Sequence, residues 1–213
     1  RIAEDNSPCR YDHVETDLNT WHFYLNGYEI VRDHIRKVVE ETYPGSSFNF
    51  IGENRQTDAP LMNSECGMVW GVDGSAGDSD LAWQYHYMLN EYRLHEKLCG
   101  FVFTEFHDVV NEFNGYYRID NTDKDFGYQD FCRGMSLCDL HAADFLAVDC
   151  PPMQTVAPGA AVAVPLVLSS FSDAHHGETC SVEWELWHDG LQGRVCDGQG
   201  AFALPEFGWG TTS

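Results

Sequence analysis

The sequence predicts an α/β fold as far as about residue 147, followed by an antiparallel β-sandwich. In the first region, short apolar or aromatic runs alternate with amphipathic segments, which is the pattern of strand–helix units around a parallel sheet. Pro151 and Pro152 mark a change, since from Thr155 onward Pro, Gly and Ala separate short runs of period two. We therefore divide the chain into two domains, residues 1–147 and residues 148–213.

The first domain is expected to contain two strand–helix units and a third strand. The first helix is the clearest element, because apolar residues from Ile30 to Val39 recur at helical spacing and Pro44 ends the pattern. The expected elements are, in order, a strand over 14–24, a helix over 28–41, a strand over 60–67, a loop over 71–80, a helix over about 81–98 and a strand over 100–106.

The second domain is predicted from two period-two runs, residues 161–168 and residues 180–187, with Asp189 and Gly190 placed as a turn. The tail from Phe207 is typical of a sandwich that is cut short. We expect the start of an immunoglobulin-like β-sandwich here.

The charge of the chain excludes some partners. Twelve Lys and Arg residues against 34 Asp and Glu residues give a formal net charge of −22, a potential that repels phosphate backbones and anionic lipid surfaces. The longest apolar run, residues 160–168, contains Pro165 and is far shorter than the roughly 20 residues of a spanning helix. We expect neither a nucleic-acid partner nor a membrane partner.

The cysteines and acidic runs do not predict a metal site or a cofactor. The eight cysteines form no CxxC pair and no zinc-ligand spacing, although disulfides Cys132–Cys138 and Cys180–Cys196 stay open, as does the cellular compartment. The acidic run 120–125 lacks the Gly and Glu of a calcium loop, so we interpret it as a polar turn.

Polar side chains end each of the three expected strands of the first domain. The carboxyl ends of the strands are where α/β barrels carry their active sites. Paired carboxyl groups with nearby aromatic rings, here including Trp70, are typical of carbohydrate chemistry. Trp21 and Phe23 are expected to pack in the core, because strand alternation directs them away from the site. The site candidates are His22, Tyr24, Glu65, Glu105, His107 and Asp108.

Four segments in order resemble glycoside hydrolase family 2, the family of β-galactosidases, β-glucuronidases and β-mannosidases. They are Glu4–Cys9, Asp17–Tyr24, Ala59–Gly67 and Gly100–Gly115. Their order is similar to that of strands five to eight of the family's (β/α)8 TIM barrel, and the tail resembles the sandwich that follows it. The resemblance implies that the chain is the C-terminal half of the barrel joined to a partial β-sandwich.

The resemblance also implies roles for the candidates. Glu65, in Ser-Glu-Cys-Gly, is similar in position to the family's nucleophile, and Tyr24 would hold it ionised by hydrogen bonding. His22 would line the site. Glu105 stands near the place of the family's tryptophan sugar platform and would bind hydroxyls instead. His107, Asp108 and Trp70 would bind or support the substrate.

The implied function is retaining hydrolysis of a β-glycoside, most closely like a β-galactosidase, through a covalent intermediate and without a cofactor. The family's acid/base glutamate, in an Asn-Glu pair, would lie before Arg1. Neither Glu91 nor Glu112, the two Asn-Glu glutamates of this chain, is placed to replace it. We therefore expect a fragment whose partner is the missing N-terminal part of the same protein. Alone, it would lose general-acid help of about 10²–10⁴-fold on natural glycosides.

Two alternatives stay open. One is a non-catalytic carbohydrate-binding or scaffold protein derived from the same fold. The other is a cellulase-like or mannanase-like barrel enzyme, against which the predicted sandwich argues.

Overall fold

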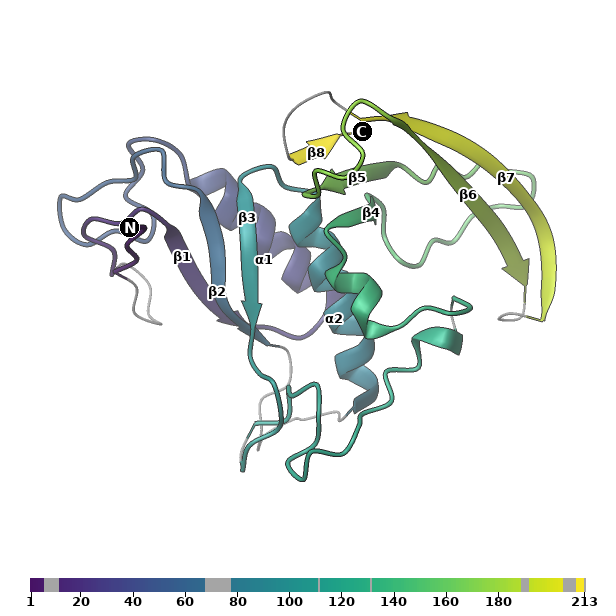
Figure 1. The fold of residues 1–213 in the computed structure, drawn as a ribbon, viewed down its shortest axis with the longest axis horizontal. Coiled ribbons are helices and arrows are strands. Elements are labelled where there is room, and N and C mark those ends of the chain that lie inside the picture. Colours follow the sequence, from purple (N-terminus) through teal and green to yellow (C-terminus); the bar gives the residue numbers. More distant parts are fainter. Residues whose placement is uncertain are drawn as a thin grey trace. The chain divides into compact units, whose positions relative to one another are not determined.

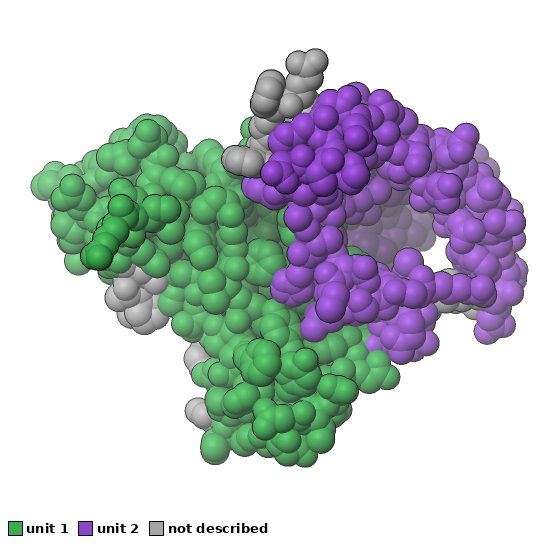
Figure 2. All heavy atoms as spheres, in the orientation of Figure 1, with its two compact units in different colours: residues 1–126 green, residues 127–213 purple. Residues whose placement is uncertain are grey.

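The computed structural model describes residues 1–5, 12–67, 78–110, 112–130, 132–188, 192–204 and 210–212. The chain forms two compact units, residues 1–126 and residues 127–213 (Figure 2). The division into domains 1–147 and 148–213 rests on composition and stays a prediction.

The first unit is built on a parallel sheet of three strands in the order β1-β2-β3. Helix α1 connects β1 to β2, and helix α2 connects β2 to β3; both helices lie on the same face of the sheet (Figure 1). The elements are β1 (Asn19–Tyr24), α1 (Tyr28–Glu41), β2 (Leu61–Gly67), α2 (Asp78–Arg93) and β3 (Leu98–Phe103).

The core lies between this sheet and the two helices. Helix α1 contributes Val31, Ile35 and Val38, spaced three and four residues apart as the sequence predicts. Strand β1 contributes Trp21 and Phe23, each of which contacts the ring of Tyr92 edge-on. From α2, the buried side chains are Leu81, Ala82, Tyr85, Met88, Leu89, Glu91 and Tyr92.

Burial of Trp21 and Phe23 determines where the polar residues of β1 lie. Successive side chains of a strand point to opposite faces of the sheet, so His22 and Tyr24 lie on the face away from the helices. They are partly exposed, whereas Trp21 and Phe23 are buried. The predicted alternation, with Trp21 and Phe23 packed in the core, is confirmed.

The second unit contains two small antiparallel sheets. One has the order β4-β5-β8 and the other is the ribbon β6-β7. The expected turn at Asp189 and Gly190 lies outside the described residues. The strands are β4 (Asp144–Val148), β5 (Leu166–Ser170), β6 (Thr179–His188), β7 (Gly193–Ala203) and β8 (Gly210–Thr212).

The predicted fold class, the C-terminal half of a (β/α)8 barrel with a partial β-sandwich, is wrong. The described residues contain only two α-helices, and their sheets have three, three and two strands. Between β3 and β4 the chain forms isolated bridges and two short 3-10 helices, η1 (Tyr128–Asp130) and η2 (Leu137–His141). Its backbone groups bond within turns, so this segment adds no further strand–helix unit. Within the described residues, the alternation of strands and helices is therefore limited to β1, β2 and β3 and the two helices between them.

The two disulfides left open by the sequence do not form. Cys180 is opposite Phe202 and Cys196 is opposite Leu186 in the β6-β7 ribbon, so these cysteines lie at different positions along it. Cys132 and Cys138 are also free, as are the other three cysteines of the described residues.

Neither helix in the described part of the chain is long and apolar enough to cross a membrane.

A buried carboxylate links the two helices and makes the fold sensitive to pH. Glu91 in α2 accepts hydrogen bonds from Arg36 Nε at 2.8 Å and from His95 Nε2 at 2.9 Å. Burial raises the pKa of Glu91, but the hydrogen bonds from His95 and Arg36 outweigh burial and lower it below its ordinary value. A lowered pKa stabilises the fold above the ordinary glutamate pKa of about 4.3, and this contribution is lost as the pH falls through the folded-state pKa.

We expect Glu91→Gln to lower the free energy of unfolding at pH 7 by about 1.5–3 kcal/mol, because charge-assisted hydrogen bonds are lost. The deficit should shrink below pH 4, where the wild-type carboxylate is itself becoming protonated. Urea unfolding at pH 7 and pH 3.5 measures both values, with the exposed Glu40→Gln as control. An equal deficit at the two pH values would contradict the prediction.

Candidate active site

A bulge between β1 and β2 turns two adjacent residues toward one histidine. Trp21 is paired with Asn63 and His22 with Glu65, so Ser64 is an extra residue in β2. His22 Nε2 lies 2.8 Å from Ser64 Oγ, and His22 Nδ1 lies 3.4 Å from Glu65 Oε2. The bulge therefore places both Ser64 and Glu65 against His22, although alternation alone would separate them.

Tyr24 and Glu65 form a short hydrogen bond. The Tyr24 hydroxyl donates to Glu65 Oε1 at 2.6 Å, the length of a charge-assisted O–H···O⁻ bond. Burial, followed by the hydrogen bond to Glu65, raises the pKa of Tyr24 well above its ordinary value. Tyr24 therefore stays protonated, and remains a donor to Glu65, throughout the physiological pH range.

Gly67, the last residue of β2, allows Tyr24 to approach. A Cβ atom at Gly67 would lie 2.7 Å from Tyr24 Cε1 and 2.7 Å from Asn114 Nδ2, closer than real Cβ contacts. The tyrosine ring and the asparagine amide therefore occupy the space that any other residue would fill. This explains the glycine of Ser-Glu-Cys-Gly in physical terms.

Glu105 lies two residues after the end of β3, the neighbour of β2. Thr104 N donates to Cys66 O at 2.9 Å, so the two strands are still hydrogen-bonded at this level. Glu105 Oε1 is buried and has no hydrogen-bond partner among the described residues. Burial, then the charge of Glu112, raises the pKa of Glu105; Asp108 and Glu65 act in the same direction and His107 against them. The ionised form of Glu105 is thus disfavoured in the folded chain.

We expect Glu105→Gln to stabilise the fold at pH 7. A raised carboxyl pKa means that ionisation costs more in the folded chain than in the unfolded chain, so wild-type stability falls as the pH rises through the folded-state pKa. The gain should vanish below about pH 4, the ordinary glutamate range, where both states are protonated. Thermal unfolding of wild type and variant from pH 3.5 to pH 8 tests this, and a variant less stable than wild type at pH 7 would contradict it.

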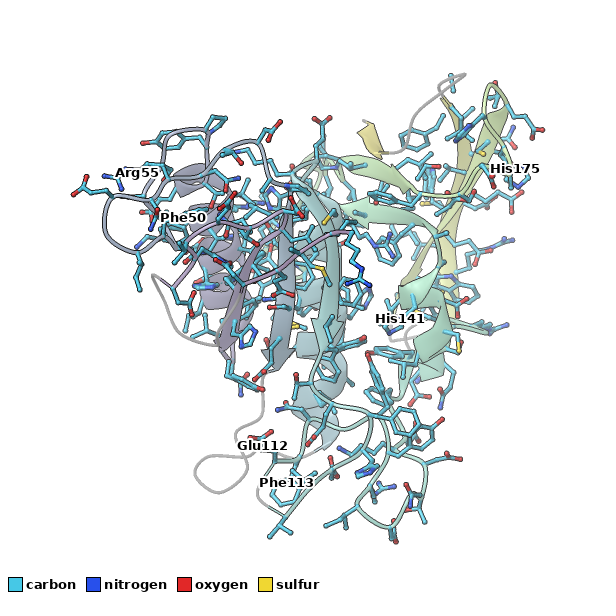
Figure 3. All side chains as sticks on the ribbon, turned by 60° about the vertical axis from the view of Figure 1, so that its left-hand side comes forward. Phe50, Arg55, Glu112, Phe113, His141 and His175 are labelled. Carbon is cyan, nitrogen blue, oxygen red and sulfur yellow. The ribbon has the colours of Figure 1, made fainter. Side chains whose placement is uncertain are left out.

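Glu112 is a residue of this region that the sequence interpretation set aside. It lies on the loop that follows β3, beyond the carboxyl ends of the strands (Figure 3). Its charge raises the pKa of both Tyr24 and Glu105, which places it near both side chains. The sequence signal that was available is the Asn114-Gly115 pair, since such pairs favour turns that reverse the chain.

The remaining predicted site residues have different environments. His107 Nδ1 is 2.9 Å from Asp108 O, and its ring contacts Phe106. Asp108 is buried in an ion pair with Lys124, so it supports the site rather than lining it. Trp70 lies outside the described residues. His22, Tyr24 and Glu65 are brought into direct contact, and Glu105 is near them.

No group of three or more His, Cys, Asp or Glu side chains is placed to hold a metal ion within the described ranges. The absence of a cofactor stays a prediction.

Comparison with known proteins does not assign the chain. No protein-family model matches it, and a search of curated proteins finds no match. The resemblance to glycoside hydrolase family 2 therefore stays a prediction, and the functional argument rests on the arrangement of Tyr24, Glu65 and their neighbours.

Proposed function

We propose that the chain carries the nucleophile of a retaining β-glycoside hydrolase, similar to family 2, with β-galactosides as its first candidate substrates. The observation that supports this most is the hydrogen bond from the Tyr24 hydroxyl to Glu65 Oε1 at 2.6 Å. A carboxylate oriented by a hydroxyl donor that stays protonated is suited to nucleophilic attack.

In the proposed reaction, a carboxylate oxygen of Glu65 attacks the anomeric carbon. A bond forms between this oxygen and the carbon while the bond from the carbon to the aglycone oxygen breaks, and the aglycone leaves with the bonding electron pair. Water then attacks the same carbon and loses a proton to the solvent, while the bond from the carbon to the Glu65 oxygen breaks and Glu65 is released as the carboxylate. Two inversions give overall retention of configuration.

Tyr24 and His22 would act on the nucleophile from two sides. Tyr24 fixes Oε1, and His22, whose other ring nitrogen lies against Ser64, stands 3.4 Å from Oε2. The hydrogen bond from Tyr24 restricts rotation of the carboxylate about its last side-chain bonds. Orientation of this kind lowers the barrier because the attack geometry is set before the reaction.

The charges around Glu65 favour a neutral glycone over a uronic acid. Glu65, Glu105 and Glu112 contribute negative charge, whereas the Lys124 ammonium is bound to Asp108 and to Phe113 O. A uronate carboxylate would meet repulsion at this site. This supports galactosides over glucuronides among the substrates of the family that the sequence resembles.

Hydrolysis of 2,4-dinitrophenyl β-D-galactoside tests the proposal. Its leaving group needs no proton, so release of the aglycone does not depend on a general acid. We expect proton NMR to show β-galactose as the first product, and p-nitrophenyl galactoside and the matching glucuronide to react more slowly. α-Galactose as the first product would contradict retention. Saturable galactose binding without turnover would favour the carbohydrate-binding alternative.

A further inference from the structure

The loop after β3, residues 104–126, is fixed by a buried ion pair. Lys124 Nζ lies 2.6 Å from Asp108 Oδ1, and the two side chains are only 1% and 7% exposed. Lys124 Nζ also donates to Phe113 O at 2.9 Å, and Gly115 N donates to Asp108 Oδ1 at 2.9 Å. The pair therefore ties the beginning of the loop to its middle and its end.

The backbone of this loop is correspondingly close-packed. Asp108 N donates to Tyr117 O at 2.9 Å, and a Cβ atom at Gly115 would overlap the backbone of His107 and Asp108. Two segments of the loop therefore lie in direct backbone contact. Asn114, which is fully buried, is held between Phe113 and Gly115, both of which bond to the ion pair.

Asn114 reaches the candidate nucleophile's strand. Its amide lies over Gly67, beside the edge of the Tyr24 ring, as the two 2.7 Å distances to the missing Cβ position show. Tyr24 therefore has Glu65, to which it donates, at its hydroxyl and the amide of Asn114 close to its ring edge. A buried side chain thus brings the loop beside Tyr24.

We propose that Asn114 is a positioning residue for the Tyr24–Glu65 hydrogen bond, and that the Asp108–Lys124 ion pair holds Asn114 in place. The expected fall in kcat rests on the proposed function, whereas the expected weakening of the Tyr24–Glu65 hydrogen bond does not. Removing the Asn114 side chain leaves space beside Tyr24, and the ring can then turn away from Glu65. In a close-packed interior, an empty space of this kind lowers the free energy of unfolding, and a neighbouring ring can move into it.

The direct test is Asn114→Ala, with Asn54→Ala as control, a partly exposed asparagine outside this loop. The chain is labelled with 3-fluorotyrosine, and the fluorine resonance of Tyr24 is assigned by its loss in Tyr24→Phe. We expect Asn114→Ala to lower the titration midpoint of Tyr24 by at least one pH unit, because the hydrogen bond to Glu65 is weakened. We expect kcat for 2,4-dinitrophenyl β-D-galactoside to fall at least tenfold while KM changes less than threefold.

The ion pair needs a double variant. Lys124→Met alone leaves a buried, unpaired aspartate, which can prevent folding. Asp108→Leu with Lys124→Met removes both charges together, and with them the hydrogen bonds to Gly115 N and Phe113 O. It should reproduce the lower Tyr24 midpoint and the lower kcat of Asn114→Ala.

The outcomes separate the two proposals. A Tyr24 midpoint and a kcat unchanged in Asn114→Ala would overturn the positioning role, and wild-type values in the double variant would overturn the role of the ion pair. A wild-type chain that hydrolyses no galactoside, but whose Tyr24 midpoint still falls in Asn114→Ala, would overturn the proposed function and leave the positioning role standing.

Discussion

Replacing Glu65 by glutamine is expected to reduce kcat for 2,4-dinitrophenyl β-D-galactoside by about 10⁴-fold or more, the scale seen when a catalytic nucleophile is removed. Glutamine has nearly the shape of glutamate and still accepts a hydrogen bond from Tyr24, but its amide oxygen is a poor nucleophile. The melting temperature should therefore change little while activity is lost. Initial rates and thermal unfolding of the same preparation measure both.

The control for this variant is Glu53→Gln, an exposed glutamate outside the site. It should retain wild-type activity. If Glu65→Gln keeps more than a tenth of the wild-type kcat, Glu65 is not the nucleophile, and the chemistry assigned to the Tyr24–Glu65 pair is wrong.

Gly67→Ala is expected to damage both stability and activity. The new methyl group would lie 2.7 Å from Tyr24 and from Asn114, so one or both must move. We expect the free energy of unfolding to fall by about 1–3 kcal/mol from overpacking. We also expect kcat to fall about 10²-fold, comparable with removing one positioned donor, because Tyr24 moves away from Glu65. Urea unfolding measures the free energy of unfolding, and initial rates measure kcat.

The neighbouring strand offers a matched control for Gly67→Ala. Gly100 in β3 is also a strand glycine, but a Cβ atom there would meet nothing within 4 Å. Gly100→Ala should therefore leave kcat near the wild-type value. Equal effects of the two substitutions would show that loss of a strand glycine, rather than contact with Tyr24 and Asn114, is responsible.

Local elements of the first unit could be predicted where one physical signal dominates. Helix α1 has the predicted bounds because its apolar spacing and Pro44 agree. Helix α2 begins and ends earlier than predicted. The apolar Leu98, which was included in the helix, begins β3 instead and pairs with Leu61. An apolar side chain such as Leu98 is compatible with a buried helix and with a buried strand. The pairing of β3 with β2 therefore determines which of the two forms.

The overall fold class could not be predicted, because the alternation of strand and helix patterns along the sequence does not show how many strand–helix units one sheet contains. Residues 107–126 follow the last strand expected in the first domain, and no further regular element was expected among them. The interaction that organises them, between Asp108 and Lys124, joins residues 16 positions apart and has no local sequence signature. The same long-range contact places Glu112 and Asn114 near the site.

The candidate site was predictable in part. Placing Glu65 and Tyr24 at the ends of neighbouring strands follows from the strand–helix pattern, and their hydrogen bond agrees with the expected pairing. The bulge at Ser64 was not predictable, because a one-residue insertion later in the strand leaves the alternate burial of Leu61 and Asn63 unchanged. That bulge brings both Ser64 and Glu65 against His22, each at a different ring nitrogen.

The most direct test of the central claim is covalent labelling of the wild-type chain with 2,4-dinitrophenyl 2-deoxy-2-fluoro-β-D-galactoside. The fluorine slows hydrolysis of the intermediate, and the leaving group needs no proton, so a competent nucleophile accumulates as the glycosyl ester. We predict a mass increase of one fluorogalactosyl group, located by peptide fragmentation on Glu65 and absent in Glu65→Gln. No adduct, or an adduct on another residue, would contradict the assignment of Glu65 as the nucleophile of a retaining glycosidase.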